Sequence, residues 1–249
     1  MTPGATPSIF ETASSQSPPA MAAPWDRIDT VILDMDGTLL DLYFDTQVWA
    51  VALPQRFAQA AGLSLAEAGA EVARRLDSAR GTLNWYCLDY WTAQLGIDVA
   101  ALEQELGHLV TPRPGAIAFL SQLAAAPPRV ILATNAHPSG MQRKFERTGI
   151  DRYFDAVASS HDYGDCKETQ RFWATFATAF DIDPATALLI DDNHNVLTAA
   201  REFGIAYLYG VRLPDTRGAP GESEQFHLLD SFAELALDEF TAALSSDPA

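Results

Sequence analysis

Two carboxylates follow directly behind a short apolar run near the start of the chain, in the segment VILDMDGT (31–38). The β-branched and apolar residues from Thr30 to Leu33 predict a buried strand, so Asp34 lies where that strand ends. Asp36, two residues further on, is placed to face the same crevice. Two close carboxylates repel each other and are stable together only with a cation or a proton between them. The pair therefore indicates a functional site rather than a structural one.

From residue 113 onward, segments typical of strands and of helices alternate along the chain. The expected strands after the first are residues 129–134, 154–158, 187–191 and 206–209. The expected helices are residues 115–123, 139–148, 167–180 and 196–203. This alternation predicts an α/β fold, with a Rossmann-like parallel sheet covered by helices on both faces.

The block between the first two strands has a different pattern. Its apolar residues recur at spacings of three and four, which is typical of helices, and it contains no convincing strand. We therefore expect a helical cap domain (44–111) inserted into an α/β core (25–43 and 112–245). Residues 1–24 are rich in Pro, Ala, Ser and Thr and lack Lys and Arg, which predicts a disordered tail, with Met21 as an alternative start.

Composition narrows the range of partners. The formal net charge of −17 over 249 residues argues against a nucleic-acid polymer, because such binders carry clustered basic residues. No segment approaches the ~20 apolar residues that span a bilayer, so we expect no membrane partner. The two cysteines, Cys87 and Cys166, fit a reducing compartment, and we expect a cytoplasmic protein. A small phosphorylated substrate is compatible with the acidity if a divalent cation handles the local charge. The sequence carries no signal for the oligomeric state.

Polar side chains end the three strands that matter most. They are Asp34 after the first strand, Thr134-Asn135 at the end of the second, and Asp191-Asp192 after the strand that begins at residue 187. Ligands of open parallel sheets bind outside the carboxyl ends of the strands, so these side chains converge on one site.

Phosphoryl transfer through an aspartate needs such a set. A carboxylate nucleophile forms an aspartyl-phosphate, and a second carboxylate protonates the leaving oxygen and then activates water. Hydroxyl, amide and cationic groups hold the phosphoryl oxygens, while Mg²⁺ neutralises the facing carboxylates. Asp34 and Asp192 suit Mg²⁺, which binds through a couple of carboxylates together with substrate and water.

The chain resembles the haloacid dehalogenase (HAD) superfamily from about residue 26 to 212. The residues that carry this resemblance are the segment Asp34–Thr38, the pair Thr134-Asn135, Lys167, and the pair Asp191-Asp192. The resemblance implies a cap inserted after the first strand of a HAD-like core, and it implies Mg²⁺ as the cofactor.

The same resemblance implies a role for each motif residue. Asp34 is the nucleophile, Asp36 the general acid/base, and Lys167 a third catalytic residue. Thr134, Asn135 and Lys167 hold the phosphoryl group. The metal ligands are Asp34, the main-chain carbonyl of Asp36, and Asp192, with Asp191 in support. The dehalogenases lack a carboxylate at the position of Asp36, so its presence favours phosphate-ester hydrolysis.

The cap is expected to select the substrate through an aromatic segment, TLNWYCLDYW (82–91). Such a cluster could stack a planar base, or it could fill the core of the cap. This segment, together with residues 41–45, 133–138 and 167–171, resembles the bacterial GMP/IMP nucleotidase branch of the superfamily. We expect a 5′-nucleotidase on purine nucleoside monophosphates. The substrate-binding candidates are Asn84, Trp85, Asp89 and His137, of which His137 alternatively caps the helix that begins at Pro138.

Two alternatives remain open at this stage. One is a phosphatase of a sugar phosphate or another small phosphomonoester, with the same machinery under a different cap. The other is a non-catalytic relative that only binds phosphorylated ligands, against which the complete set of carboxylates and lysine speaks.

Overall fold

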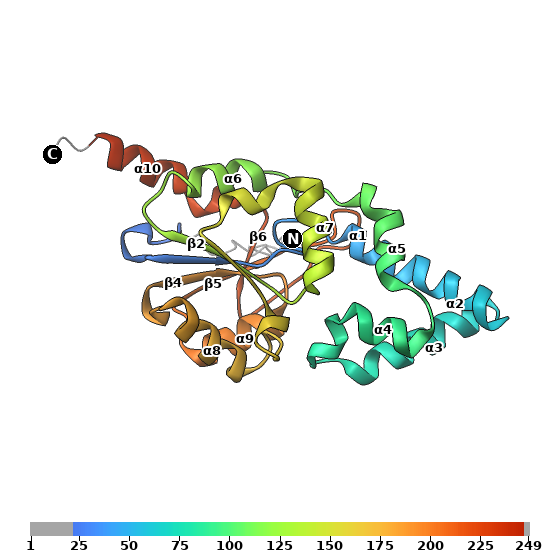
Figure 1. Ribbon diagram of the computed structural model, residues 1–249. Helices are drawn as coiled ribbons and strands as arrows, with labels where there is room; N and C mark the ends of the chain where they lie inside the picture. Colours follow the sequence, from blue (N-terminus) through green and yellow to red (C-terminus); the bar gives the residue numbers. More distant parts are fainter. Residues whose placement is uncertain (1–21, 247–249) are drawn as a thin grey trace, which may run out of the picture.

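The computed structural model describes residues 22–246, and a six-stranded parallel sheet with the order β3-β2-β1-β4-β5-β6 forms its centre (Figure 1). The strands are β1 (Thr30–Leu33), β2 (Arg129–Thr134), β3 (Ala156–Ser159), β4 (Ala187–Ile190), β5 (Tyr207–Val211) and β6 (His227–Leu229). Leu33 is in register with Leu132 of β2 and with Ile190 of β4. The carboxyl ends of the three central strands therefore meet at one edge, beside the point where the strand order reverses.

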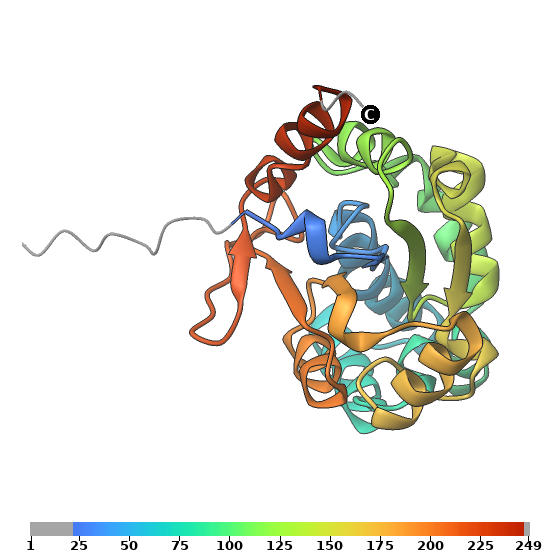
Figure 2. The same ribbon diagram turned by 90° about the vertical axis from the view of Figure 1, so that its left-hand side faces the viewer.

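Alternate residues of β1 contribute to two separate hydrophobic layers. Val31 and Leu33 face the layer that contains Phe119, and Ile32 faces the layer that contains Trp173. Helices α6 (Ala116–Leu123) and α7 (Pro138–Thr148) cover the first face, with α10 (Leu237–Ser246) packed beside α6, and α8 (Gln170–Phe180) and α9 (His194–Phe203) cover the second (Figures 1 and 2). Both faces are buried, which is why the strands are apolar throughout.

The insertion after β1 is entirely helical, as the sequence predicts, and it lies at one end of the sheet (Figure 1). Its α-helices are α1 (Tyr43–Thr46), α2 (Leu53–Ala61), α3 (Leu65–Ala79), α4 (Leu88–Leu95) and α5 (Val99–Leu106). A π-helical stretch, Gln47–Ala52, joins α1 to α2 just before Pro54. Proline has no N–H to donate to the carbonyl four residues earlier. The hydrogen bonds of the preceding turn therefore take the i→i+5 pattern of a π-helix.

The two crossings between core and cap lie side by side. Leu40 and Pro112 form an isolated antiparallel bridge. The Asp41 N–H donates to the Thr111 carbonyl over 2.9 Å, and the Arg113 N–H donates to the Leu39 carbonyl over the same distance. These contacts place the start and the end of the helical insertion next to each other.

Several elements differ in detail from the sequence prediction. The strand β6 was not predicted, and β3 begins at Ala156 rather than at residue 154. Helix α8 begins at Gln170 rather than at Lys167, because the Thr169 side chain caps it by accepting from the Phe172 N–H. The three residues before α8 are thereby free to form part of the site.

At the N-terminus, residues 1–21 of the expected tail lie outside the described residues. Ala23 is buried, and the Trp25 indole N–H donates to the Leu235 carbonyl over 2.6 Å. The packed chain therefore begins before residue 25, slightly earlier than the sequence predicts. Cys87 and Cys166 are both free thiols. Within residues 22–246, no helix is both long and apolar enough to cross a membrane.

Candidate active site

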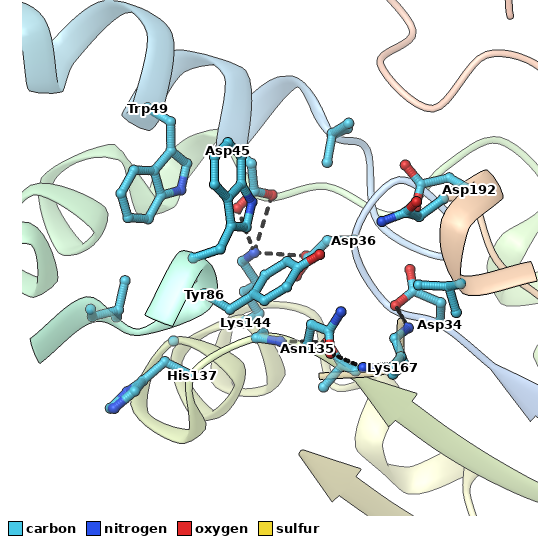
Figure 3. Close-up of a pocket in the computed structure, with 18 of the residues that line it drawn as sticks. Asp34, Asp36, Asp45, Trp49, Tyr86, Asn135, His137, Lys144, Lys167 and Asp192 are labelled. Carbon is cyan, nitrogen blue, oxygen red and sulfur yellow. Dashed lines mark hydrogen bonds and ion pairs between the residues drawn. The ribbon is translucent and has the colours of Figure 1, made fainter. Parts of the chain in front are cut away.

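A cavity of about 460 Å³ lies between the cap and the carboxyl ends of the central strands. Asp34 enters it from the end of β1 and Asp192 from the loop after β4 (Figure 3). Thr134, the last residue of β2, also lines it. Lys167 reaches the same place from the loop before α8. The structure thus brings together the core residues that the sequence singles out.

Lys167 is the centre of a buried charge cluster. Its Nζ lies 2.5 Å from Asp34 Oδ1 and 2.7 Å from Asp191 Oδ2, and it also donates to the Ala133 carbonyl over 2.9 Å. Lys167 is 1% exposed. Burial alone would lower the pKa of Lys167, but the carboxylates of Asp191 and Asp34 outweigh burial and raise it above its ordinary value. The lysine is therefore a fixed positive charge beside the predicted nucleophile.

Burial and mutual repulsion make the carboxylates of this cluster difficult to ionise. Burial raises the pKa of Asp34 to about 7 despite the neighbouring lysine, and burial together with Asp34 raises the pKa of Asp192 well above its ordinary value. Asp34 Oδ2 is buried without a hydrogen-bond partner. One carboxylate oxygen from each of Asp34, Asp191 and Asp192 lies within 4.8 Å of the others. An orphaned buried oxygen in an all-oxygen cluster fits a Mg²⁺ ion.

Gly37 is required by the geometry of this cluster. It has a φ of +82°, and a Cβ built there would collide with the Asp192 carboxylate. Its carbonyl accepts a 2.7 Å hydrogen bond from Arg113 Nη1, which is buried. Only glycine combines the left-handed conformation with this close approach. The turn after Asp36 therefore lets the first and fourth strands place their carboxylates against each other.

Lys144 is a site residue that the sequence analysis missed. Its Nζ lies 2.7 Å from Asp36 Oδ1 and 3.0 Å from Asp45 Oδ1, and its side chain is 4% exposed (Figure 3). Asp45 belongs to α1 of the cap, whereas Lys144 belongs to α7 of the core. Burial would lower the pKa of Lys144, but Asp36 and Asp45 raise it instead. The only signal in the sequence was scarcity, because Lys144 and Lys167 are its sole lysines.

Thr134 ends β2 and Asn135 follows it, and their side chains make different hydrogen bonds. The Thr134 hydroxyl accepts from the Ala136 N–H over 3.0 Å, which leaves its proton free to donate. Asn135 Oδ1 accepts from the Lys167 N–H over 2.9 Å, and its Nδ2 donates to Glu168 over 3.0 Å. The Asn135 side chain therefore positions the loop that carries Lys167.

Glu168 links the cap to this loop. Its carboxylate accepts from the Tyr86 hydroxyl over 2.5 Å and from Asn193 Nδ2 over 3.3 Å, in addition to Asn135. Tyr86 lies in a 3₁₀ turn of the cap (Leu83–Tyr86), so this hydrogen bond crosses from cap to core. Both Tyr86 and Asn193 line the cavity, and neither was a predicted contact.

The structure divides the predicted substrate-binding residues. Trp85 and His137 line the cavity, whereas Asn84 and Asp89 are exposed and lie outside its lining. Those two predictions rested on proximity in sequence, but Asn84 in the 3₁₀ turn Leu83–Tyr86 and Asp89 in the first turn of α4 both have exposed side chains. Trp91 is buried and donates to the Trp85 carbonyl, so it supports the cap. Trp49, from the π-helical stretch, supplies a second indole to the cavity wall.

Comparison with known proteins agrees with this geometry. Residues 28–204 match the family model described as haloacid dehalogenase-like hydrolase. The chain belongs to this family. Among curated relatives, GMP/IMP nucleotidase YrfG of Escherichia coli (strain K12) is 40% identical over 211 residues, which cover 85% of this chain and 95% of the relative. The same protein from Shigella flexneri matches equally well.

Solved structures of the HAD family share the fold at low sequence identity. A HAD phosphatase from Thermococcus onnurineus superimposes with a TM-score of 0.69 at 18% identity, over 89% of this chain and 100% of that one. An L-2-haloacid dehalogenase from Xanthobacter autotrophicus gives a TM-score of 0.56 at 19% identity, over the same shares. These likenesses confirm the predicted α/β fold with a Rossmann-like parallel sheet.

Proposed function

We propose that this HAD-family hydrolase is a Mg²⁺-dependent 5′-nucleotidase that hydrolyses purine nucleoside monophosphates. The single observation that carries the activity is the buried pairing of Asp34 with Lys167 beside Asp192, in a cavity closed by the cap. The 40% identity to a GMP/IMP nucleotidase over most of the chain supports the purine substrate.

In the first step, an Asp34 oxygen attacks the phosphorus and the bond to the ester oxygen breaks. Lys167 and the Thr134 hydroxyl are placed to hold phosphoryl oxygens as charge shifts onto them. Asp36 donates a proton to the departing 5′ oxygen, so the nucleoside leaves as a neutral alcohol. The phosphoryl group is then an acyl phosphate on Asp34.

In the second step, Asp36 takes a proton from a water molecule, which attacks the phosphorus and frees Asp34. Lys144 holds the Asp36 carboxylate on the side of the cavity that faces the cap. A Mg²⁺ ion bound by Asp34, the Asp36 carbonyl and Asp192, with Asp191 in support, would neutralise the charge of the carboxylates and the phosphate.

The cavity suits a nucleotide in size and in lining. Its volume of about 460 Å³ falls within the ~300–1,000 Å³ of typical small-molecule sites. The lining combines the polar side chains of the carboxylate cluster with the indoles of Trp49 and Trp85. The Arg80 guanidinium lies 4.6 Å over the Trp85 ring and holds it in place. Flat aromatic walls bind planar bases by stacking.

The two free thiols support the predicted cytoplasmic location.

A phosphate-release panel with Mg²⁺ tests this proposal. It compares GMP, IMP, AMP, CMP and glucose 6-phosphate at equal concentrations. We expect kcat/KM for GMP or IMP to exceed that for glucose 6-phosphate at least tenfold. A better rate on the sugar phosphate would contradict the purine assignment and leave the phosphatase chemistry intact. Absence of phosphate release from every ester would contradict the activity itself.

A further inference from the structure

A thiol and two imidazoles meet at the boundary between cap and core, outside the carboxylate cluster. One ligand atom each from Cys87, His137 and His161 lies within 4.8 Å of the others. Cys87 precedes α4 in the cap, His137 precedes α7 in the core, and His161 lies in the 3₁₀ turn Ser160–Asp162 after β3. We call these three residues the thiol–imidazole cluster. All three are partly buried.

Each member of the thiol–imidazole cluster has a ligand atom available. His161 Nε2 is buried and has no hydrogen-bond partner. His137 Nδ1 accepts from the Ser139 N–H over 3.4 Å, as the cap of α7, and lies 2.9 Å from Ser139 Oγ. With its proton on Nδ1, the ring donates to Ser139 Oγ instead and leaves the Nε2 lone pair free for a metal.

A fourth oxygen ligand lies close by. The Asp89 carboxylate is 3.6 Å from His137 Nε2, and its side chain is 86% exposed and free to turn. A set of one thiolate, two imidazoles and one carboxylate or water matches tetrahedral Zn²⁺. The set does not match Mg²⁺, which takes oxygen ligands. The two proposed metal sites of this protein therefore select different ions.

We propose that Cys87, His137 and His161 form a Zn²⁺ site that ties the cap to the core, and that Zn²⁺ bound there inhibits hydrolysis. Binding replaces the thiol proton of Cys87 with the metal and releases that proton. His137 also lines the substrate cavity, so a metal on its Nε2 joins the cavity wall to the cap through Cys87. Domain closure and opening around a substrate accompany turnover in many capped enzymes, and a metal bridge would slow opening.

Titration with Co²⁺, a spectroscopic substitute for Zn²⁺, tests the site independently of activity. We expect wild-type protein to develop a thiolate-to-Co²⁺ charge-transfer band with tetrahedral d–d bands, and Zn²⁺ to abolish them. Cys87→Ser should lose the charge-transfer band, and its hydroxyl can still cap α4. His161→Gln should weaken binding at least tenfold. Cys166→Ala is the matched control, and it should bind as wild type does because Cys166 is buried elsewhere.

Two further measurements distinguish metal binding at this site from metal binding at the carboxylate cluster. Asp34→Asn should keep the Co²⁺ spectrum, so the test stands even if the proposed function fails. With GMP as substrate, Zn²⁺ should inhibit wild-type protein at saturating Mg²⁺, and Cys87→Ser should relieve that inhibition at least tenfold while its rate without Zn²⁺ is unchanged. The proposal is wrong if wild-type protein shows no thiolate band, or if Cys87→Ser and His161→Gln bind Co²⁺ as tightly as wild type.

Discussion

Lys144 Nζ lies 2.7 Å from Asp36 Oδ1, and this buried ion pair joins the predicted acid/base to helix α7. The same ammonium group contacts Asp45 of the cap at 3.0 Å. One lysine therefore orients the proposed acid/base, Asp36, and also holds the cap against the core. The resemblance that locates Asp36 gave no indication of this partner.

Replacing Lys144 with Met should affect both stability and turnover. Removing one partner of a buried ion pair costs about 3 kcal/mol or more, because the remaining carboxylates lose their counter-charge. We expect a lower free energy of unfolding, measured with urea, and a kcat on GMP reduced at least tenfold. The double variant Lys144→Met/Asp45→Asn should regain part of the stability but not of the turnover. Wild-type kcat in Lys144→Met would contradict the role of this pair.

Gly37→Ala should disable the site without unfolding the protein. The added methyl group would meet the Asp192 carboxylate, and alanine also disfavours the φ of +82°. The matched control is Gly62→Ala, where φ is +66° and no atom lies within 4 Å of the added Cβ. Both changes carry a backbone cost of about 1 kcal/mol. Only Gly37→Ala should lower kcat/KM on GMP, by about a hundredfold; equal kinetics in the two variants would contradict the close-approach argument.

Mg²⁺ binding should weaken as the pH falls below neutrality. The pKa of Asp34 is about 7 in the folded protein and that of Asp192 is also raised, so both hold protons more tightly there than in the unfolded chain. In metal-free protein the free energy of unfolding should therefore fall as the pH rises from about 4 to 7, because the folded state must then ionise these buried groups. Mg²⁺ binds the charged form and must displace a proton below pH 7, at a cost of roughly tenfold in affinity per pH unit.

Thermal melts with and without Mg²⁺ measure this competition. The rise in Tm on adding Mg²⁺ should be larger at pH 8 than at pH 5.5. Asp192→Asn should show a small rise at both pH values. A Mg²⁺-induced rise that is larger at pH 5.5 would show that the ion binds elsewhere.

Tyr86→Phe should act mainly on substrate affinity. The Tyr86 hydroxyl donates to Glu168 across the boundary of cap and core, and a hydrogen bond to a charged group contributes about 1.5–3 kcal/mol. We expect KM for GMP to rise about tenfold while kcat changes less than threefold, measured by initial rates. Tyr90→Phe, four residues along in α4, is the control and should behave as wild type. A fall in kcat alone would assign Tyr86 to the chemistry instead.

Sequence reasoning predicted the core well because its signals are local. The apolar run before Asp34 and the run ending at Thr134 each specify a strand, and the parallel arrangement brings their ends together. The helical block was equally clear from its periodicity. β6 was missed because three residues after a long loop carry no distinguishable pattern.

The residues that the sequence did not reveal are those defined by contacts between domains. Lys144 lies 108 residues from its partner Asp36, and Tyr86 meets Glu168 only because the cap lies over the core. Asn84 is the opposite case: it was predicted to bind substrate because it is next to Trp85 in the sequence, but it does not line the cavity. Local pattern places side chains on elements, whereas the arrangement of the elements decides which side chains meet.

The most direct test of the central claim is single-turnover phosphate release from GMP by Asp34→Asn with saturating Mg²⁺. An amide cannot form the acyl phosphate, so the account predicts a loss of at least a thousandfold relative to wild type, with the thermal melt of a folded protein retained. Release within tenfold of the wild-type rate would contradict it, because the phosphoryl group would then reach water without passing through Asp34.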